Sequence, residues 1–300
     1  MPSQPFNRLA IIGYAGWAAE PITKAFINAG VPVKLLNRVG GSADPSKFPT
    51  DAKNVTTAQF DYDDEASIIK AFEDVDIVIS LVSGPGLASQ IKLAPALAKS
   101  PSVKLFVPSE LGGDYDRELA KNVEIVEVKF KVQDALKKEK VPFVLVPIGG
   151  FAEFVFSIPF LGINLATNEI EFADGSQTNT LAVSSVAYTA AGFLSLFATT
   201  PPAQLAGRHI WLIERRVSGD EIVAALKKTG APKVTVRPLE EVRGVIAQGG
   251  YPGLAALVRT QWAEGGHAAG ADVWEVEGYE RATVEDWVGG RRLGALPHRG

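Results

Sequence analysis

The sequence predicts an α/β protein with a doubly wound parallel sheet, and three observations support this prediction. Short apolar runs alternate with helical patterns through the first half of the chain. A turn containing Gly13 and Gly16 follows the first apolar run. The run 75–81 (VDIVISL) is mostly apolar, as expected of a strand buried on both faces. Strands separated by helices imply right-handed βαβ units, as in a Rossmann-type fold.

Each element of the first half has its own local signal. The apolar runs predict strands at 8–12, 31–37, 55–60, 75–81, 103–108 and 141–146. The helical patterns predict helices at 18–29, 64–72, 88–98 and 124–138. In the helix 64–72, the spacing of Ala66, Ile69 and Phe72 predicts one apolar face.

The second half is less regular and predicts a smaller α+β region, interleaved with the first. We expect a buried helix at 186–197 capped by Ser184 or Ser185, and a helix at 218–228 whose Ser218 and Glu221 fit a capping box. Further helices are expected at 239–248, 254–264 and 283–288, with short strands at 209–213 and 234–236. We therefore divide the chain functionally into residues 1–150 and 151–300.

Composition excludes several kinds of chemistry. The chain has 300 residues and no Cys, which removes disulfides, thiolate metal sites and a Cys nucleophile. Its three histidines, His209, His267 and His298, are scattered, so we expect no metal site. The net charge is −4 (30 Lys+Arg against 34 Asp+Glu), which gives no reason to expect nucleic acid or an anionic membrane as partner. A dissolved cofactor is the remaining source of reactive chemistry.

Targeting and membrane signals are weak in this sequence. The N-terminal stretch MPSQPFNRLAII does not have the basic and long apolar regions of a signal peptide. The uncharged stretches 154–167 and 175–207 are interrupted by proline or polar residues, which argues against a membrane span. We therefore expect a cytoplasmic protein.

The glycine turn is the strongest motif. Its residues Gly13, Tyr14, Ala15, Gly16, Trp17 and Ala18 lie between the first strand and the first helix. A tight turn at a helix N-terminus brings free N–H groups and a positive dipole end to a pyrophosphate. The spacing G-x-x-G-x-x-A differs from the dinucleotide fingerprint G-x-G-x-x-G, so an ordinary strand–helix turn is the alternative interpretation.

The end of the second strand favours NADP(H) over NAD(H). NAD sites place a carboxylate there to bind the ribose hydroxyl, whereas this strand ends in Asn37-Arg38. An arginine suits a 2′-phosphate, and the alternative is a solvated surface arginine. Because ligands gather at the carboxyl ends of parallel strands, we expect further contacts there. The candidates are Asp61, the segment Ser83-Gly84-Pro85-Gly86, and the segment Pro108-Ser109-Glu110. Taken singly, most of these are ordinary turn residues.

The short-chain dehydrogenase pair Tyr-x-x-x-Lys is absent. The chain has six tyrosines, and the residue four positions after each of them is not a lysine. The standard short-chain mechanism is therefore disfavoured.

Several segments together resemble the isoflavone reductase-like and phenylcoumaran benzylic ether reductase-like enzymes, a branch of the NmrA-like, atypical short-chain dehydrogenases. The carriers of this resemblance are the turn 13–17 (GYAGW), segment 105–112 (LFVPSELG), segment 129–133 (KFKVQ) with 141–143 (VPF), Gly150-Phe151, and 283–287 (TVEDW). The match covers essentially the whole chain and is clearest over residues 8–155. The chain departs from the family pattern at Ala15, Ala19, Gln133 and Ser184-Ser185.

The resemblance implies that Lys129 is the catalytic lysine and that it also touches the cofactor, as does Phe151. A lysine facing a nicotinamide pocket can act as general acid or base. Lys131 is the alternative, and it points about 200° away on a helix, so both cannot face the same site. On the reductase hypothesis, Phe151, Phe154, Phe156 and Phe160 would wall an apolar pocket, as small-molecule sites generally require. The alternative is that these aromatic residues are plain core, which is the more frequent case.

Two functions remain open. The first is an NADPH-dependent reductase that transfers hydride to a conjugated or benzylic carbon of a small aromatic or polyketide-like substrate. The second is a non-catalytic NADP(H)-binding sensor or regulator of the NmrA type. The expected partner is a small-molecule substrate, with the chain acting as a monomer or a homodimer.

Overall fold

The computed structural model describes residues 5–267 and 270–294. The chain divides into two compact units, which are described separately. The first unit contains the described residues up to Glu110, with Val128–Val146 and Ala190–Ile210. The second contains Leu111–Glu127, Pro147–Thr189 and the described residues from Trp211 onward.

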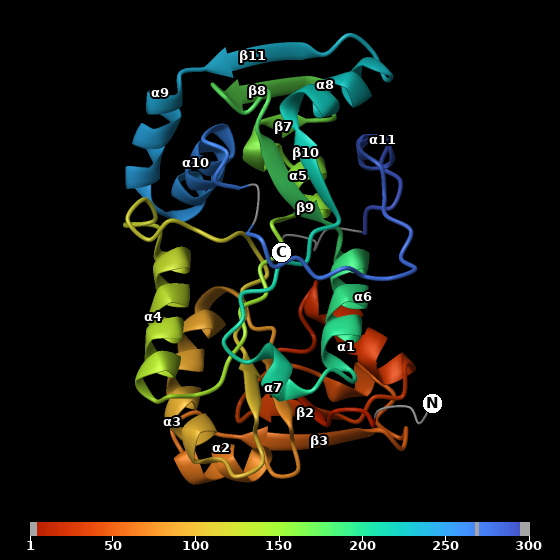
Figure 1. Cartoon of the computed structure of the whole chain (residues 1–300), viewed down its shortest axis with the longest axis vertical. Coiled ribbons are helices and arrows are strands. Elements are labelled where there is room, and N and C mark those ends of the chain that lie inside the picture. The colour runs from red at the N-terminus through yellow and green to blue at the C-terminus, as the bar shows by residue number, and fades with distance from the viewer. Residues whose placement is uncertain (1–4, 268–269, 295–300) are drawn as a thin grey trace. The chain divides into compact units, whose positions relative to one another are not determined.

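A five-stranded parallel sheet is the centre of the first unit, with the order β3-β2-β1-β4-β5. Its neighbouring strands β2 and β3 are labelled in Figure 1. Its strands are β1 (Leu9–Ile12), β2 (Val33–Arg38), β3 (Val55–Phe60), β4 (Ile77–Ser80) and β5 (Leu105–Val107). Leu9 pairs with Val33 of β2 on one side and with Ile77 of β4 on the other. The strands that follow β1 are therefore added first on one side of it and then on the other, which makes β1 and β4 the switch point of the strand order. This order confirms the predicted doubly wound Rossmann-type fold.

Helices cover the sheet because its strands are apolar on both faces. The elements that follow the strands in order are α1 (Ala19–Asn28), η1 (Pro45–Lys47), α2 (Glu65–Ala71), η2 (Gly84–Lys92), α3 (Leu93–Lys99) and α4 (Glu124–Lys138). One buried cluster joins Ala10 and Val78 of the sheet to Ile68 of α2, Leu97 of α3 and Val132 of α4. Helices α2 and α3 lie side by side in this layer (Figure 1).

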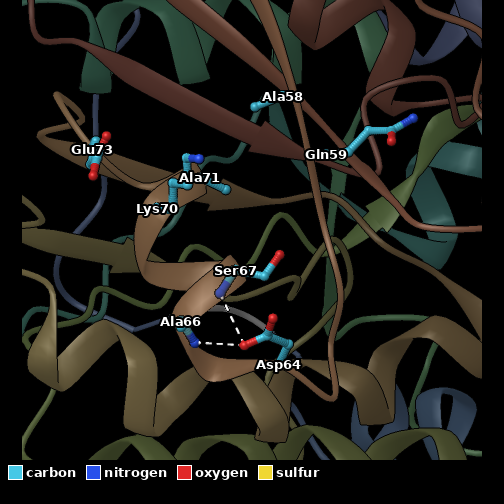
Figure 2. Close-up of a pocket in the computed structure, with 8 residues that line it drawn as sticks. All are labelled: Ala58, Gln59, Asp64, Ala66, Ser67, Lys70, Ala71 and Glu73. Carbon is cyan, nitrogen blue, oxygen red and sulfur yellow. Dashed lines mark hydrogen bonds between the residues drawn. The ribbon is translucent and has the colours of Figure 1, made fainter.

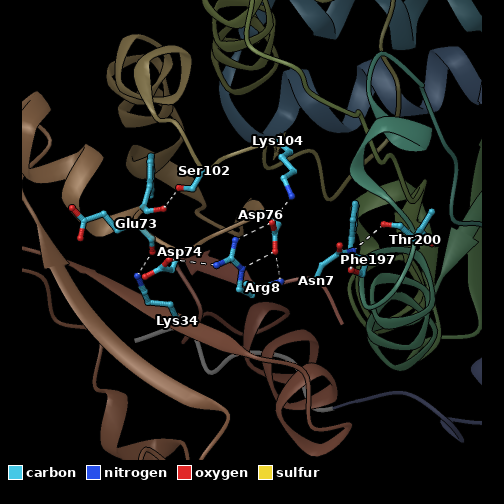
Figure 3. A network of polar contacts seen from close by, with 11 residues as sticks. Asn7, Arg8, Lys34, Glu73, Asp74, Asp76, Ser102, Lys104, Phe197 and Thr200 are labelled. Atoms are coloured by element: carbon cyan, nitrogen blue, oxygen red, sulfur yellow. Dashed lines mark hydrogen bonds and ion pairs between the residues drawn. The ribbon is translucent and has the colours of Figure 1, made fainter. Parts of the chain in front are cut away.

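An ion-pair network joins the amino ends of three strands (Figure 3). Asp76, just before β4, accepts a hydrogen bond from the Arg8 guanidinium at 2.9 Å, and the Lys104 ammonium lies 2.9 Å from its other oxygen. The Arg8 amide also donates to Asp76. These hydrogen bonds and charges outweigh the effect of burial and hold the pKa of the Asp76 carboxyl well below its ordinary value.

Three predictions for this unit need correction. Segment 141–146 is not a continuous strand: Phe143 makes a single parallel bridge with Phe106, and Leu145 makes one with His209, so the segment changes partner after two residues. The predicted helix 88–98 is two elements, the 3₁₀ helix η2 and the α-helix α3. The buried face of α2 is formed by Ile68 and Ala71 rather than by Ala66, which is exposed.

The second unit contains two three-stranded sheets, of which the sequence predicts one strand, 234–236, inside β11. The first has the order β10-β9-β6 and the second β11-β8-β7. Their strands are β6 (Gly150–Phe151), β7 (Ile163–Asn164), β8 (Glu169–Ala173), β9 (Thr180–Ser184), β10 (Arg215–Ser218) and β11 (Lys233–Arg237). These strands are short and only partly alternating, so periodicity alone gave little signal for most of them.

The helices of the second unit pack on these sheets. They are α5 (Ala152–Ser157), η3 (Pro159–Leu161), α8 (Gly219–Lys227), α9 (Leu239–Gly244), η4 (Val245–Gln248), α10 (Gly250–Ala263) and α11 (Val284–Val288). In the core, Phe156 stacks on Trp287 and Phe172 meets Trp262 edge to face. Phe156 therefore belongs to the core, and its predicted place in a pocket wall is wrong.

Local capping signals in this half are confirmed. Ser218 caps α8 and makes the predicted capping box with Glu221. Helix α6 (Val186–Phe197) has its predicted bounds, and the Ser185 hydroxyl accepts from the Tyr188 amide in its first turn.

The predicted strand 209–213 is wrong. This segment makes only two isolated bridges, from His209 to Leu145 and from Trp211 to Val273. The remaining short helix is α7 (Pro202–Leu205). In the part of the chain that the structure describes, no helix is long and apolar enough to cross a membrane.

Candidate functional site

The turn after β1 is shaped by glycine at its first position. Gly13 has φ +77°, a conformation that L side chains rarely adopt. A Cβ there would lie 2.8 Å from the Val82 amide nitrogen, so the turn packs directly against the segment after β4. A Cβ on Gly16 would make only ordinary contacts, and that residue is exposed. The turn is therefore closed on its inner side and open on its outer side.

Helix α1 begins without a side-chain cap. Ala18 occupies the N-cap position, and no side chain of the described residues accepts from the first amides of the helix. The Glu20 amide donates to the Gly16 carbonyl at 2.8 Å, and Pro21 has no N–H. What the helix presents at the turn is therefore chiefly the positive end of its dipole, which favours an anionic group such as a pyrophosphate.

The end of β2 lies against the turn. The Tyr14 hydroxyl donates to Asn37 Oδ1 at 2.6 Å, and burial raises the pKa of this phenol, so it remains a donor. The tyrosine side chain is buried, so this predicted cofactor residue can offer only its backbone to a ligand. The neighbouring Arg38 is exposed, and no carboxylate within the described ranges pairs with its guanidinium. A free guanidinium at this position suits a phosphate.

The segments after β4 and β5 are joined by hydrogen bonds. The Ser109 hydroxyl donates to the Val82 carbonyl at 2.8 Å, and its amide donates to Gln90 Oε1 at 2.9 Å. Ser83 begins η2 in an extended conformation, and Gly84 follows it with φ +53°. Pro108 and Ser109 are buried, so they stabilise the packing of the segments after β4 and β5 and offer little side-chain surface to a ligand.

Lys129 forms the next contact along this edge. Its Nζ donates to the backbone oxygen of Glu110 and lies 3.6 Å from Glu110 Oε2. The side chains of Lys129 and Glu110 are only 11% and 8% exposed. Gln133, one turn further along α4, donates from Nε2 to Glu110 Oε1 at 2.9 Å. A buried cation and a buried carboxylate therefore stand together beside the end of β5.

Lys129 and Lys131 differ in how far their side chains are exposed to solvent. Lys131 is exposed, whereas the Lys129 side chain lies against Glu110. The structure thus places Lys129 at the carboxyl edge together with the residues that follow β1, β2, β4 and β5.

Two predicted cofactor residues are not part of this line of contacts. The Asp61 carboxylate accepts from the Asp63 amide and so stabilises its own turn. Phe151 lies in the second unit, where it pairs with Ser184 and packs near the Phe154 ring, so its role remains a prediction. Trp17 and Ala15 are half-buried in the turn itself.

A groove elsewhere in the first unit is separate from this site (Figure 2). It lies between β3 and α2, and its lining includes Gln59, Asp64, Lys70 and Glu73. Asp64 is already engaged as the cap of α2, accepting from the amides of Ala66 and Ser67. None of the predicted site residues lines it.

Three residues at this edge are not among the candidates that the sequence offers: Asn37, Gln90 and Gln133. Glu110 is expected here, because it follows Pro108 and Ser109 after the fifth predicted strand. The other three depend on contacts between distant segments, for which the local sequence carries no signal.

Comparisons with known proteins agree with the fold and the motifs. A phenylcoumaran benzylic ether reductase of Ginkgo biloba is 30% identical over 164 residues, and one of Pinus taeda is 33% identical over 159 residues. These stretches cover 52% and 49% of this chain, and the chain spans about half the length of the relatives, 52% and 50%.

Solved structures resemble nearly the whole chain. An isoflavone reductase has a TM-score of 0.74 at 20% identity, and a Vitis vinifera leucoanthocyanidin reductase described as a complex with NADPH has a TM-score of 0.74 at 16% identity. Each comparison covers 94% of this chain and 98% of the other. At these identities the likeness shows a shared fold. The NmrA-like family model matches residues 6–243, and the chain therefore belongs to the NmrA-like family.

Proposed function

We propose that this chain is an NADPH-dependent reductase that delivers hydride to a conjugated or benzylic carbon of a small aromatic or polyketide-like substrate. One observation carries the proposal: contacts run along the carboxyl edge of the sheet from Asn37 through Tyr14, Gly13 and Val82 to Ser109. Glu110 follows Ser109 and accepts a hydrogen bond from Lys129, so a glycine turn suited to phosphate and a nearly buried lysine share this edge. The reductase names of the relatives support the same chemistry.

The chain's own residues would bind and orient the cofactor. The open side of the turn and the uncapped N-terminus of α1 would hold the pyrophosphate. Arg38 would bind the 2′-phosphate, because its guanidinium is exposed and no described carboxylate neutralises it. When bound, NADPH supplies the hydride.

Lys129 would handle the proton. Its Nζ is nearly buried and is held at the end of β5, where a nicotinamide ring is expected in a fold of this kind. In that position Nζ can donate a proton to the substrate atom that gains negative charge as hydride arrives. It can also donate a hydrogen bond that orients the ribose.

Two measurements test this function. The first is the affinity of the purified protein for NADPH and for NADH, followed by nucleotide fluorescence; preference for NADH would contradict the role of Arg38. The second is NADPH oxidation against a panel of conjugated enones and benzylic ethers. Tight NADPH binding with no turnover of any substrate in the panel would favour the regulatory alternative.

A further inference from the structure

We propose that Glu110 is the positioning residue of Lys129, and that Gln133 fixes Glu110 in that role. The carboxylate keeps the lysine ammonium charged and holds it at the end of β5. Its importance for proton transfer rests on the proposed function, whereas the electrostatic coupling concerns only side chains of this chain.

Glu110 contacts the Lys129 ammonium through both its backbone and its side chain. Lys129 Nζ lies 3.6 Å from Oε2 and also donates to the backbone oxygen of the same residue. Both side chains are about nine-tenths buried. With little water to screen it, a carboxylate at this distance strongly favours the charged form of an amine. Two contacts from one residue also leave Nζ little freedom of position.

Gln133 completes the arrangement without adding charge. It lies four residues after Lys129 on α4, so both side chains emerge on the same face of the helix. Its amide donates to Oε1, the oxygen that Lys129 does not pair with. An arginine there would add a second cation and compete for the carboxylate. Because glutamine is neutral, the charge of Glu110 acts on Lys129.

The test is the pH dependence of lysine acylation in the purified apo protein. Only the neutral amine reacts, so brief labelling with acetic anhydride from pH 6 to 11, read by peptide mass spectrometry, gives a pH midpoint for each lysine. In Glu110→Gln we expect the Lys129 midpoint to fall by at least about 1 pH unit. Lys131, which is exposed on the same helix, should keep its midpoint.

Glu118→Gln is the matched control. Glu118 pairs with Lys121 at the surface, so this variant should affect Lys121 and leave Lys129 unchanged. An unchanged Lys129 midpoint in a folded Glu110→Gln protein would overturn the proposal. Should Glu110→Gln not fold, Gln133→Arg provides the second arm, because the added cation should also lower the Lys129 midpoint, and no change there would overturn it equally.

This experiment separates the inference from the proposed function. Acylation requires neither cofactor nor substrate, so a shifted midpoint in a protein that never oxidises NADPH would support the coupling and refute the reductase. If the protein is active, the alkaline limb of its kcat/KM profile should move to lower pH in Glu110→Gln. An unmoved midpoint in an active enzyme would refute the coupling alone.

Discussion

The two ends of the parallel sheet in the first unit use charge in opposite ways. At the amino end, the Asp76 carboxylate lies between the Arg8 and Lys104 cations and also accepts from the Arg8 amide, so these charges neutralise one another within the network (Figure 3). At the carboxyl end, Glu110 faces Lys129, and Arg38 has no carboxylate partner among the described residues. The first arrangement stabilises the fold, whereas the second leaves positive charge available for a ligand.

The largest expected effect is at the carboxyl end. Lys129→Met should lower kcat/KM for NADPH oxidation by about 10²–10⁴-fold, because the proton donor is removed. NADPH affinity should fall much less, by about tenfold at most, because a single hydrogen bond to the ribose is lost. Steady-state kinetics and nucleotide fluorescence measure the two quantities. Lys131→Met is the control and should retain activity, since its side chain is exposed. Full activity in Lys129→Met would remove the lysine from the mechanism.

At the amino end the expected effect is on stability instead. Asp76→Asn should lower the free energy of unfolding by about 2–4 kcal/mol, because Arg8 and Lys104 lose their shared anion. Urea denaturation at pH 7 measures this loss. Asp74→Asn should change stability by less than about 0.5 kcal/mol, since the Asp74 side chain is 88% exposed. A clear loss of NADPH affinity in Asp76→Asn would contradict the separation of the two ends.

The buried imidazole of His267 should make the stability of the protein depend on pH in a different range. His267 of the second unit is buried, its Nδ1 has no hydrogen-bond partner among the described residues, and burial lowers its pKa to about 4. Between pH 6.5 and about 4, His267 is protonated in the unfolded chain but stays neutral in the folded chain. Stability should therefore fall by about 2–3 kcal/mol as pH drops from 6.5 to 4.

Two variants separate this window from that of Asp76. His267→Asn should abolish the slope between pH 6.5 and 4 in urea denaturation series. The lowered pKa of Asp76 contributes stability that is present above about pH 3.9, its ordinary value, and is lost as pH falls further, so Asp76→Asn should flatten only that more acidic range. A wild-type slope in His267→Asn would rule out His267 as the source.

The smallest effect is expected at the end of β2. Arg38→Ala should weaken NADPH affinity about 10–30-fold and leave NADH affinity unchanged, because one charge-assisted phosphate contact is lost. Fluorescence titration with both nucleotides measures the difference. Lys34→Ala is the matched control: Lys34 lies on the same strand at the amino end, where it donates to the Glu73 carbonyl. Equal loss for both nucleotides would contradict phosphate recognition by Arg38.

Prediction from the sequence was most accurate where a single segment contains the whole signal. Strand β3 and helices α4 and α6 have their predicted bounds, and the capping box of α8 is present. The predictions were less accurate where strand pairing or the buried face of a helix depends on contacts between two distant segments. The segment around Phe143 makes only isolated bridges, from Phe143 to Phe106 and from Leu145 to His209, and the buried face of α2 is set by the sheet against which it packs.

The sequence by itself determined the doubly wound fold class, the glycine turn, Arg38 and the family resemblance, because periodicity, turn chemistry and motifs are local properties. Only the tertiary structure decided which lysine lies inward, that Tyr14 turns away to Asn37, and that Glu110 and Gln133 stand beside Lys129. Those facts depend on how distant segments meet at one edge of the sheet, where burial strengthens the attraction between charges that would be screened in water.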